Sequence, residues 1–364
     1  MRIVAVKGYA IRFPFLGGGF TTSYGRRAGL ANLLLALETD ASMTGYGEVC
    51  QTSGATRPPL DDEVVADIAQ RCERLVGAEA LEIAGTIGLL GAGAGANLRC
   101  GVETALWDLM GKAAGEPLAR LLGGRRSGAM PVYVSIGSDE PAAMARAAAV
   151  ARRRGVVRFQ VKIAGASRGD VERMAAVASE LRPGESALVD ANGAMTVAEA
   201  LELAAATEGL DVLFEEPCRS YAENLEFARA AGRPVVLDQC MTSLPLYARA
   251  VAAGAFAGVC VKPTVLGGIA AARTARDLCI AAELPLKMDD SWAADAGSMA
   301  ALHLAAGVPA ELLQSTVDMR GYFEGAMFAG GAVTRDGATE VGDEPGLGLT
   351  PLPDRFGRPL FACA

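Results

Sequence analysis

The sequence predicts an α/β protein in which a (β/α) barrel of modified TIM type follows an N-terminal α+β capping domain. From residue 130 onwards, eight short apolar runs alternate with alanine-rich segments of helical pattern. Strands that alternate with helices form a parallel sheet, and eight such units favour a closed barrel over an open doubly wound sheet. Before residue 126, strand-like runs come first and helical patterns follow, which is typical of a separate small domain. With 364 residues, 51% of them hydrophobic, the chain can bury the cores of both units.

The predicted domain boundaries follow this change of pattern. We place the capping domain at residues 1–126 and the barrel, with the active site, at 127–325. The remaining segment, 326–364, is glycine-rich. We expect it to be irregular and to return to the capping domain.

The N-terminal region predicts strands followed by helices. Strand-like runs are IVAVKGYAIRF, ANLLLALETD and TGYGEVC. Residues 16–29, between the first two runs, are glycine-rich and polar, so we expect a mobile loop. This loop is not a phosphate cradle, because it lacks a Gly-Lys-Ser/Thr ending and a Gly-x-Gly-x-x-Gly spacing. Apolar residues then recur at helical spacing in DDEVVADIAQRCERLV and GVETALWDLMGKAAG.

Each barrel strand is predicted by a short apolar run that ends in polar residues. In chain order the runs are VYVSIG, FQVKIA, ALVDANG, VLFEEP, VVLDQ, GVCVKP, PLKMDDS and LLQSTVD.

Composition excludes several classes of function. A net charge of −8 argues against nucleic acid and anionic membrane surfaces as partners. We see no signal peptide and no apolar run long enough to span a bilayer. The eight cysteines form no Cys-x-x-Cys pair, so we expect small buried side chains in a reducing, cytoplasmic setting. The single histidine, His303, lies in an alanine-rich helical segment and is expected to be structural. One histidine cannot build a Ser-His-Asp triad or a His-rich zinc site.

Charged residues end successive predicted strands. Asp190, Glu215 and Asp238 end the third, fourth and fifth strands, and Lys162 and Lys262 end the second and sixth. A single acid after a strand is more often a helix cap, and a single lysine is more often a surface charge. In a barrel, however, the carboxyl ends of all strands share one mouth. The joint pattern therefore predicts three carboxylates at the centre of the mouth with a lysine on each flank.

Three clustered carboxylates repel one another unless a cation neutralises them. Hard oxygen donors suit Mg²⁺ better than zinc, so we expect one Mg²⁺ per active site. A metal that chelates a substrate carboxylate can stabilise the enediolate formed when the α-proton leaves. A lysine can act as the base if burial and nearby cations lower its pKa. Two opposed lysines allow epimerisation, whereas one base and one acid allow elimination of a β-leaving group.

On these residues the chain resembles the enolase superfamily. Within it, the chain is similar to the branch with lysines on the second and sixth strands: muconate-lactonizing enzymes, dipeptide epimerases, and the hydroxyproline and proline-betaine enzymes. The resemblance implies Asp190, Glu215 and Asp238 as metal ligands and Lys162 and Lys262 as acid/base residues. In the Glu-Glu-Pro stretch the first glutamate takes the ligand role. The segments that carry the resemblance are ETALWDLMGKAAGEPLARLLGG, VDANG, FEEP, LDQ, VKPTVLGGI and DDSWAADAGSMAALHLAA.

The second strand departs from the common pattern of that branch. Members commonly have Lys-x-Lys, in which the first lysine lowers the pKa of the second, but here the first position is Gln160. Lys162 must therefore rely on burial, on the metal and on Lys262. A Gln-x-Lys strand is similar to that of the proline-betaine and hydroxyproline-type members.

The eighth strand bears on the substrate. Dipeptide epimerases carry Asp-x-Asp there to hold an α-ammonium group, and this chain matches only the first position, Asp318. A quaternary betaine nitrogen would need aromatic rings, for which Trp292 is the nearby candidate; it would pack on the substrate ring or buttress the seventh loop. An aspartate suits an amine that still has protons to donate. The resemblance thus implies β-elimination of water from a proline-type amino acid such as cis-3-hydroxy-L-proline.

Further substrate contacts are expected from residues around the mouth. These are Gln160, Asp290, Ser23, Tyr24 and Gln51. The alternative function is a 2-epimerase or racemase of an amino acid, a proline betaine or a dipeptide. A barrel that only binds a small carboxylate is a third reading, against which the acids and both lysines argue. Family likeness also implies a homo-oligomer.

Overall fold

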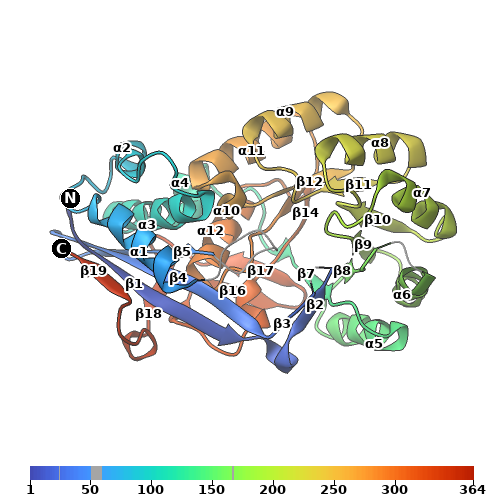
Figure 1. Cartoon of the computed structure of the whole chain (residues 1–364), viewed down its shortest axis with the longest axis horizontal. Helices are drawn as coiled ribbons and strands as arrows, with labels where there is room; N and C mark the ends of the chain where they lie inside the picture. Colours follow the sequence, from blue (N-terminus) through green and yellow to red (C-terminus); the bar gives the residue numbers. More distant parts are fainter. Residues whose placement is uncertain (24, 51–59, 166–167) are drawn as a thin grey trace.

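The computed structural model describes residues 1–23, 25–50, 60–165 and 168–364. It confirms the predicted fold class: an antiparallel sheet with helices stands at one end and a parallel (β/α) barrel at the other (Figure 1). Both chain termini lie at the end formed by the capping domain.

The capping sheet has the strand order β19-β1-β4-β5, and every pair is antiparallel. Alternate residues of β4 face opposite sides, because side chains alternate along a strand. Leu33, Leu35 and Leu37 therefore join the core of the capping domain, whereas Leu34 joins the core shared with the barrel. This explains why residues 33–37 of β4 are all apolar. The strands are β1 (Ile3–Pro14), β4 (Gly29–Thr39), β5 (Thr44–Val49) and β19 (Phe361–Cys363).

Helices α1 (Asp62–Glu73) and α3 (Ala96–Ala114) pack on the capping sheet, and α2 (Ile83–Gly88) packs against α3. Helix α3 lies unusually close to β5. A Cβ atom on Gly47 would lie 1.8 Å from the carbonyl oxygen of Gly101, so only glycine permits this approach.

Where we expected a mobile loop, the described residues between 16 and 29 include a 3₁₀ turn and two paired strands. A 3₁₀ turn, η1 (Leu16–Gly18), leads into β2 (Phe20–Thr22) and β3 (Gly25–Arg27), which pair in antiparallel register. The ring of Phe20 packs against Trp292 of the barrel at a centroid distance of 5.2 Å. This tertiary contact, which no local pattern encodes, anchors the hairpin at the mouth.

The barrel consists of eight parallel strands in chain order, β7 to β14. An isolated parallel bridge between Val132 and Thr316 brings the first and last strands together. The strands are β7 (Tyr133–Ile136), β8 (Arg158–Lys162), β9 (Ser186–Asp190), β10 (Val212–Glu215), β11 (Val235–Leu237), β12 (Gly258–Val261), β13 (Leu286–Met288) and β14 (Leu313–Thr316).

Helices connect these strands on the outside of the barrel (Figure 1). Helices α7 and α8 each begin with a capping box, formed by Thr196 with Glu199 and by Ser220 with Glu223. The helices are α4 (Leu118–Leu121), α5 (Pro141–Arg152), α6 (Arg168–Ala178), α7 (Val197–Ala206), α8 (Tyr221–Ala231), α9 (Leu244–Ala253), α10 (Pro263–Leu266), α11 (Ile269–Ala281) and α12 (Asp295–Ala305).

The C-terminal segment contains short strands where we expected irregular chain. After η2 (Met319–Tyr322), β16 (Ala332–Arg335) pairs with β17 (Ala338–Val341), and β17 pairs with β6 (Met130–Pro131). The strand β19 then pairs with β1 in the capping sheet. Partners far along the chain decide these pairings, which is why short glycine-rich runs did not predict them. The other elements are β15 (Phe328–Gly330), β18 (Leu349–Pro351) and η3 (Pro353–Arg355).

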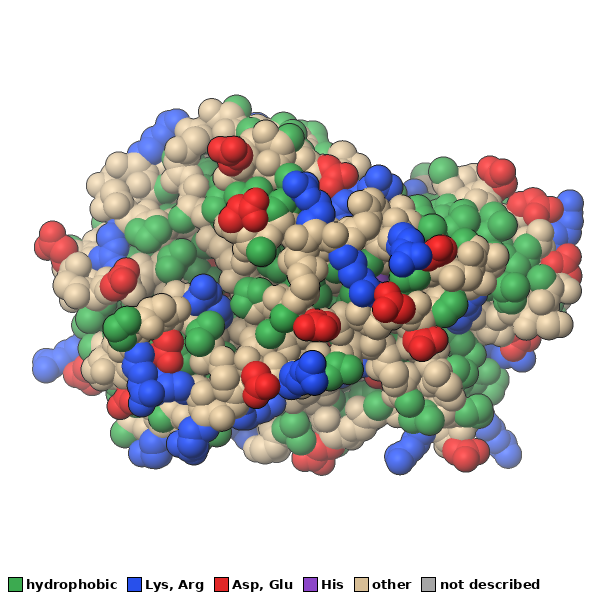
Figure 2. Space-filling view, turned by 180° about the vertical axis from the view of Figure 1, so that it is seen from behind, with side chains coloured by type: hydrophobic (Ala, Val, Ile, Leu, Met, Phe, Trp, Pro, Cys, Tyr) green, Lys and Arg blue, Asp and Glu red, His purple; other side chains and the backbone are tan. Residues whose placement is uncertain are grey.

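Acidic and basic side chains are interspersed over the face shown in Figure 2. Among the described helices, none combines the length and the apolar character needed to cross a bilayer.

His303 lies on α12 and is buried. Its Nδ1 atom accepts the backbone N–H of Ala119 at 3.2 Å. Burial lowers the pKa of His303 from 6.5 to about 4. The folded chain therefore binds fewer protons at this site than the unfolded chain between these two values.

We expect acidification from about pH 6.5 to pH 4 to remove about 3 kcal/mol of stability through His303. The loss occurs because His303 binds a proton in the unfolded state, whereas the buried ring in the folded state remains neutral until the pH is near 4. Urea unfolding of the wild type and of His303→Gln, which keeps an acceptor but does not titrate, would measure it. The chain has one histidine, so NMR can follow its ring directly. A ring that titrates near pH 6.5 in the folded protein would contradict the prediction.

Candidate active site

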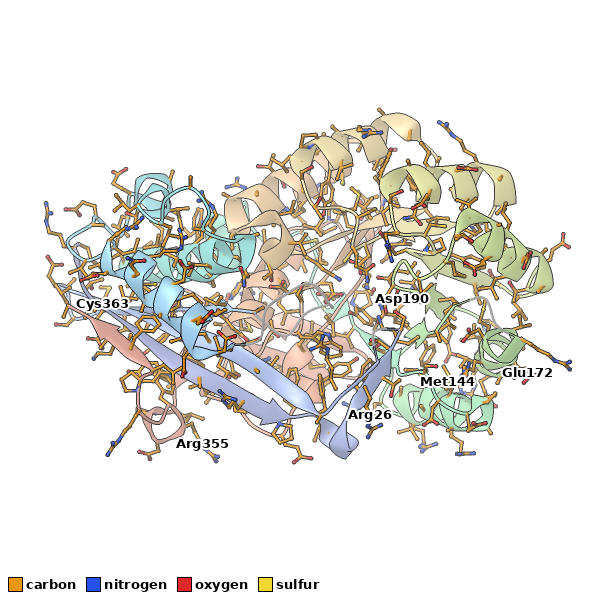
Figure 3. The ribbon with its side chains drawn as sticks, in the orientation of Figure 1. Arg26, Met144, Glu172, Asp190, Arg355 and Cys363 are labelled. Carbon is orange, nitrogen blue, oxygen red and sulfur yellow. The ribbon has the colours of Figure 1, made fainter. Side chains whose placement is uncertain are left out.

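A cavity of about 910 Å³ opens at the carboxyl ends of the barrel strands. The capping domain contributes Thr22, Ser23 and Arg27 to its lining. In Figure 3, Asp190 lies at the end of its barrel strand, above the hairpin that carries Arg26. We call this space the mouth cavity.

Asp190, Glu215 and Asp238 come together as predicted by their positions at strand ends. One carboxylate oxygen from each lies within 4.8 Å of the others. Strand register explains the proximity, because Asp190 pairs with Glu215 across β9 and β10. All three are buried. Three converging carboxylates form a hard-oxygen donor set that fits Mg²⁺.

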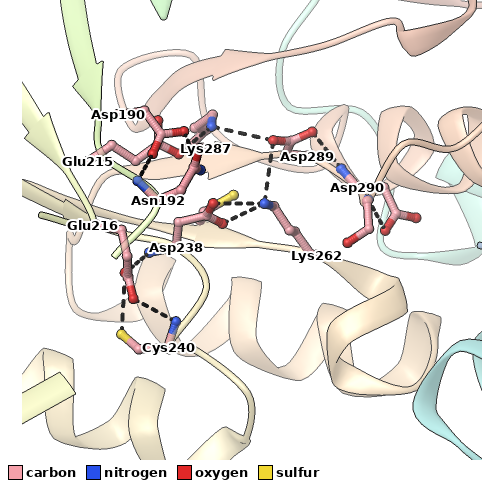
Figure 4. A network of polar contacts seen from close by, with 12 residues as sticks. Asp190, Asn192, Glu215, Glu216, Asp238, Cys240, Lys262, Lys287, Asp289 and Asp290 are labelled. Carbon is pink, nitrogen blue, oxygen red and sulfur yellow. Dashed lines mark hydrogen bonds and ion pairs between the residues drawn. The ribbon is translucent and has the colours of Figure 1, made fainter. Parts of the chain in front are cut away.

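Lys162 and Lys262 both line the mouth cavity. They stand on the second and sixth of eight strands, so they lie on opposite walls of the barrel. Lys162 forms an ion pair with Asp190. The Nζ atom of Lys262 lies 2.7 Å from Oδ1 of Asp238 (Figure 4). Each lysine therefore contacts one carboxylate of the triad.

The state of Lys262 departs from the expectation of a lowered pKa. Burial favours the neutral amine and is the largest single influence, but the nearby negative charges, of which Asp238 is the strongest, together outweigh it and hold the pKa of Lys262 well above its usual value. Asp289 acts in the same direction, at 3.9 Å. Lys262 can therefore serve as a base only when Asp238 is engaged by another cation.

A third lysine at the site, Lys287 on β13, was missed by the sequence reasoning. It is fully buried, and its Nζ atom lies 2.6 Å from Oε1 of Glu215 and 3.4 Å from Oδ2 of Asp289 (Figure 4). The ring centroid of Tyr133 lies 4.6 Å from the same atom. A charged amine inside an apolar strand needs a partner. A lysine within an apolar run was therefore a sequence feature that could have identified Lys287 as well as Lys162.

Gln160 contacts the triad carboxylates as well as lining the cavity. Its Nε2 atom donates to Asp190 at 3.0 Å and to Glu215 at 2.7 Å. Ser135 donates to its Oε1 atom at 2.8 Å, which orients the amide. Gln160 and Lys287 thus hold opposite oxygens of Glu215.

Glu216 has a different role from its neighbour Glu215. Its carboxylate accepts the backbone N–H groups of Asp238 at 2.7 Å and Cys240 at 2.8 Å, so it shapes the turn that carries Asp238. Burial raises the pKa of Glu216 to about 8. Asn192 acts similarly on Asp190, to which its backbone N–H donates at 2.7 Å. The resemblance assigned the ligand role to the first glutamate of the Glu-Glu-Pro stretch, but sequence reasoning did not identify Glu216 or Asn192 as supporting residues.

The predicted substrate contacts fall into three groups. Asp290 and Ser23 line the mouth cavity. Tyr24 and Gln51 lie outside the described residues. Asp318 is not among the cavity-lining residues.

Asp318 is engaged by its own neighbours. Nε and Nη2 of Arg320 donate to its two oxygens at 2.8 and 2.7 Å, and Thr334 donates to it at 2.9 Å. The 3₁₀ turn η2 brings Arg320 back onto the aspartate, which caps that turn. The structure therefore does not bring Asp318 to the position of a substrate-ammonium partner.

An aromatic wall closes one side of the mouth cavity. Trp292 and Tyr322 line the cavity, and their ring centroids are 6.3 Å apart. Phe15 and Phe20 of the capping domain pack on Trp292 at 4.8 and 5.2 Å. Sequence reasoning singled out only Trp292, because the other rings come from distant segments.

Comparison with known proteins identifies relatives of the whole chain. Residues 19–123 match the family described as mandelate racemase / muconate lactonizing enzyme, N-terminal domain, and residues 142–355 match the enolase C-terminal domain-like family. A cis-3-hydroxy-L-proline dehydratase of Roseibium aggregatum is 30% identical, over 99% of each chain. An N-succinylamino acid racemase of Amycolatopsis sp is 28% identical, over 97% of this chain and 96% of the relative.

A solved structure is similar over its full length. It is a mandelate racemase/muconate lactonizing enzyme of Roseovarius nubinhibens ISM described as putative and complexed with magnesium. Its TM-score is 0.91 at 28% identity, and the match covers 100% of both chains.

Proposed function

The chain belongs to the enolase superfamily, and from this premise we propose that it is a hydro-lyase acting on a proline-type amino acid, namely a cis-3-hydroxy-L-proline dehydratase. The observation that carries the proposal is the carboxylate triad with a lysine on either side of the cavity. The similarity to a dehydratase of that substrate over 99% of each chain supports the choice among superfamily reactions.

We propose Mg²⁺ as the cofactor, held by Asp190, Glu215 and Asp238. When bound, it would neutralise the substrate carboxylate and stabilise the negative charge that develops there as the α-proton leaves. The relative complexed with magnesium supports this assignment.

Lys162 and Lys262 divide the proton transfers between them. One lysine, as the neutral amine, takes the proton from the α-carbon. The ammonium form of the other donates a proton to the 3-hydroxyl group as the C–O bond breaks, so that water leaves. The product enamine then tautomerises to a cyclic imine acid. The opposed positions of the two amines allow both transfers without movement of the ring.

The rest of the cavity would hold the ring and its amine. The aromatic wall of Trp292 and Tyr322 excludes water from one face of the substrate. Because Arg320 pairs with Asp318, and Lys262 and Lys287 engage Asp289, we assign the substrate amine to Asp290, which lines the cavity.

A 2-epimerase or racemase is the second candidate. The symmetric placement of two lysines favours it, because each could serve one face of the same α-carbon. The aromatic wall would also suit the quaternary nitrogen of a proline betaine. Relatives include an N-succinylamino acid racemase. A barrel that only binds a ligand would not need opposed lysines.

The deciding experiment is incubation with Mg²⁺ in D₂O, followed by NMR. The panel holds cis-3-hydroxy-L-proline, 4-hydroxyprolines, L-proline, proline betaine and dipeptides. We expect loss of water from cis-3-hydroxy-L-proline. Deuterium exchange at the α-carbon without loss of water would assign an epimerase instead. Neither reaction on any compound would reject the proposal.

The described cysteines are all free thiols, six of them buried. This supports our proposal of a reducing, cytoplasmic setting. Family likeness supports the proposal of a homo-oligomer.

A further inference from the structure

The loop after β13 carries a strained residue at the cavity. Trp292 has a φ of 50°, in the left-handed region, which a bulky side chain rarely adopts. The ring nevertheless forms part of the aromatic wall. Such a backbone conformation persists only where the surroundings hold it.

A capping-domain side chain holds the backbone of Trp292. The Nδ2 atom of Asn32, on β4, donates to the carbonyl oxygen of Trp292 at 2.9 Å. The same atom donates to Oε1 of Glu48, on β5, at 2.7 Å. Both polar residues are buried, so these contacts are shielded from water.

Glu48 supplies the N-terminal cap of the helix that follows the loop. Its Oε1 accepts the backbone N–H of Ala294 at 2.7 Å, and its Oε2 accepts that of Gly297 at 3.1 Å. The N-cap residue of α12 is Ala294, which has no side-chain acceptor of its own. Helix α12 is therefore capped by the other domain.

Gly297 keeps the space that this cap requires. A Cβ atom there would lie 2.6 Å from the Cβ atom of Ala293 and 3.4 Å from Oε2 of Glu48. The start of the helix thus leaves room for the glutamate, and three hydrogen bonds from the capping sheet hold the segment 292–297.

We propose that Glu48 and Asn32 are positioning residues that hold the backbone of Trp292 and thereby fix the orientation of its ring. The strands of the capping sheet, and not only the loops of the capping domain, would then shape the aromatic wall against which the substrate ring lies. The inference rests on the proposed function only in taking the substrate to contain a proline-type ring. Neither residue is among those that line the mouth cavity, so both act through Trp292.

The test follows the environment of Trp292 directly. The chain has two tryptophans, so Trp107→Phe leaves Trp292 as the sole fluorophore. In this background, Glu48→Gln replaces one acceptor oxygen with a donor that faces backbone N–H groups. We expect a rise in acrylamide quenching of Trp292 and an increase of about tenfold in KM. Mg²⁺ affinity, measured by calorimetry, should stay unchanged, because the triad makes no contact with Glu48.

A second variant dissects the network. Asn32→Ala removes the bond to the Trp292 carbonyl but leaves Glu48 on α12. Asn32→Ala should also increase the quenching of Trp292, but it should lower the thermal stability less than Glu48→Gln does. It provides the test if Glu48→Gln fails to fold. Burial raises the pKa of Glu48 to about 7, so the measurements are made at about pH 8.5, where the carboxylate is charged.

Asp108→Asn is the matched control. Asp108 is a buried capping-domain acid that accepts the backbone N–H groups of Tyr46 at 3.0 Å and Leu347 at 2.9 Å, away from the cavity. It should lower the melting temperature without changing Trp292 quenching or KM. Equal effects of Glu48→Gln and Asp108→Asn on quenching would overturn the inference. Quenching and calorimetry need no turnover, so they test it even if the proposed substrate is wrong.

Discussion

Replacement of either Lys162 or Lys262 with alanine should lower turnover by a factor of about 10²–10⁴ while the fold and the Mg²⁺ affinity persist. The loss is expected because both lysines line the cavity from opposite walls and each contacts a triad carboxylate. Steady-state assays with the substrate identified by the panel would measure it. Circular dichroism and calorimetry would establish that fold and metal binding survive.

Proton exchange in D₂O can then distinguish the two lysines. The variant that lacks the base should lose exchange at the α-carbon, whereas the variant that lacks the acid should retain it while losing dehydration. Lys7→Ala is the matched control, because Lys7 is also an ion-paired lysine, with Glu38 at 2.6 Å, but lies on the capping sheet. Full turnover in either site variant would remove that lysine from the mechanism.

The second large effect concerns the metal. We expect Mg²⁺ to raise the melting temperature of the wild type, with about 2.7 kcal/mol of stabilisation at a concentration one hundred times Kd. Glu215→Gln should abolish both this shift and turnover, because the triad loses a ligand. Calorimetric titration and thermal scans with and without EDTA would measure the change.

Two further variants make the metal test decisive. Asp108→Asn changes a buried acid of the capping domain, whose oxygens accept backbone N–H groups away from the cavity, and should keep the Mg²⁺-dependent shift. Glu215→Gln also removes the closest acidic partner of the buried Lys287, which costs stability. The double variant Glu215→Gln/Lys287→Met avoids that cost and should still fail to bind Mg²⁺. Retention of the shift in both Glu215 variants would exclude Glu215 as a ligand.

The local sequence pattern was sufficient to predict the strands of the barrel, but not those of the segments around it. All eight barrel strands occur at the predicted runs, because a buried parallel strand is apolar throughout and ends in polar residues. The β2–β3 hairpin and the strands of the C-terminal segment were missed. Their runs are short and rich in glycine, and contacts with distant residues such as Trp292 stabilise them.

Sequence reasoning correctly predicted which charged residues lie at the strand ends of the site, but it did not predict which side chains pair with one another. Asp318 lies two residues beyond the end of β14, yet Arg320, two residues further on, pairs with it. Lys287 lies inside its strand and pairs with Glu215, far along the chain. The position of a residue along its strand indicates how far along the barrel axis its side chain lies, but it does not indicate which side chain it contacts.

By itself, the sequence determined that acids and lysines converge at one mouth. Parallel strands alternating with helices place their carboxyl ends together, so order along the chain sets order around the barrel. Only the tertiary structure decided which carboxylate meets which amine, that Glu48 caps a helix of the other domain, and that four aromatic rings form one wall. Those choices depend on contacts of a few ångströms between residues remote in the chain, and no periodicity of the sequence encodes such distances.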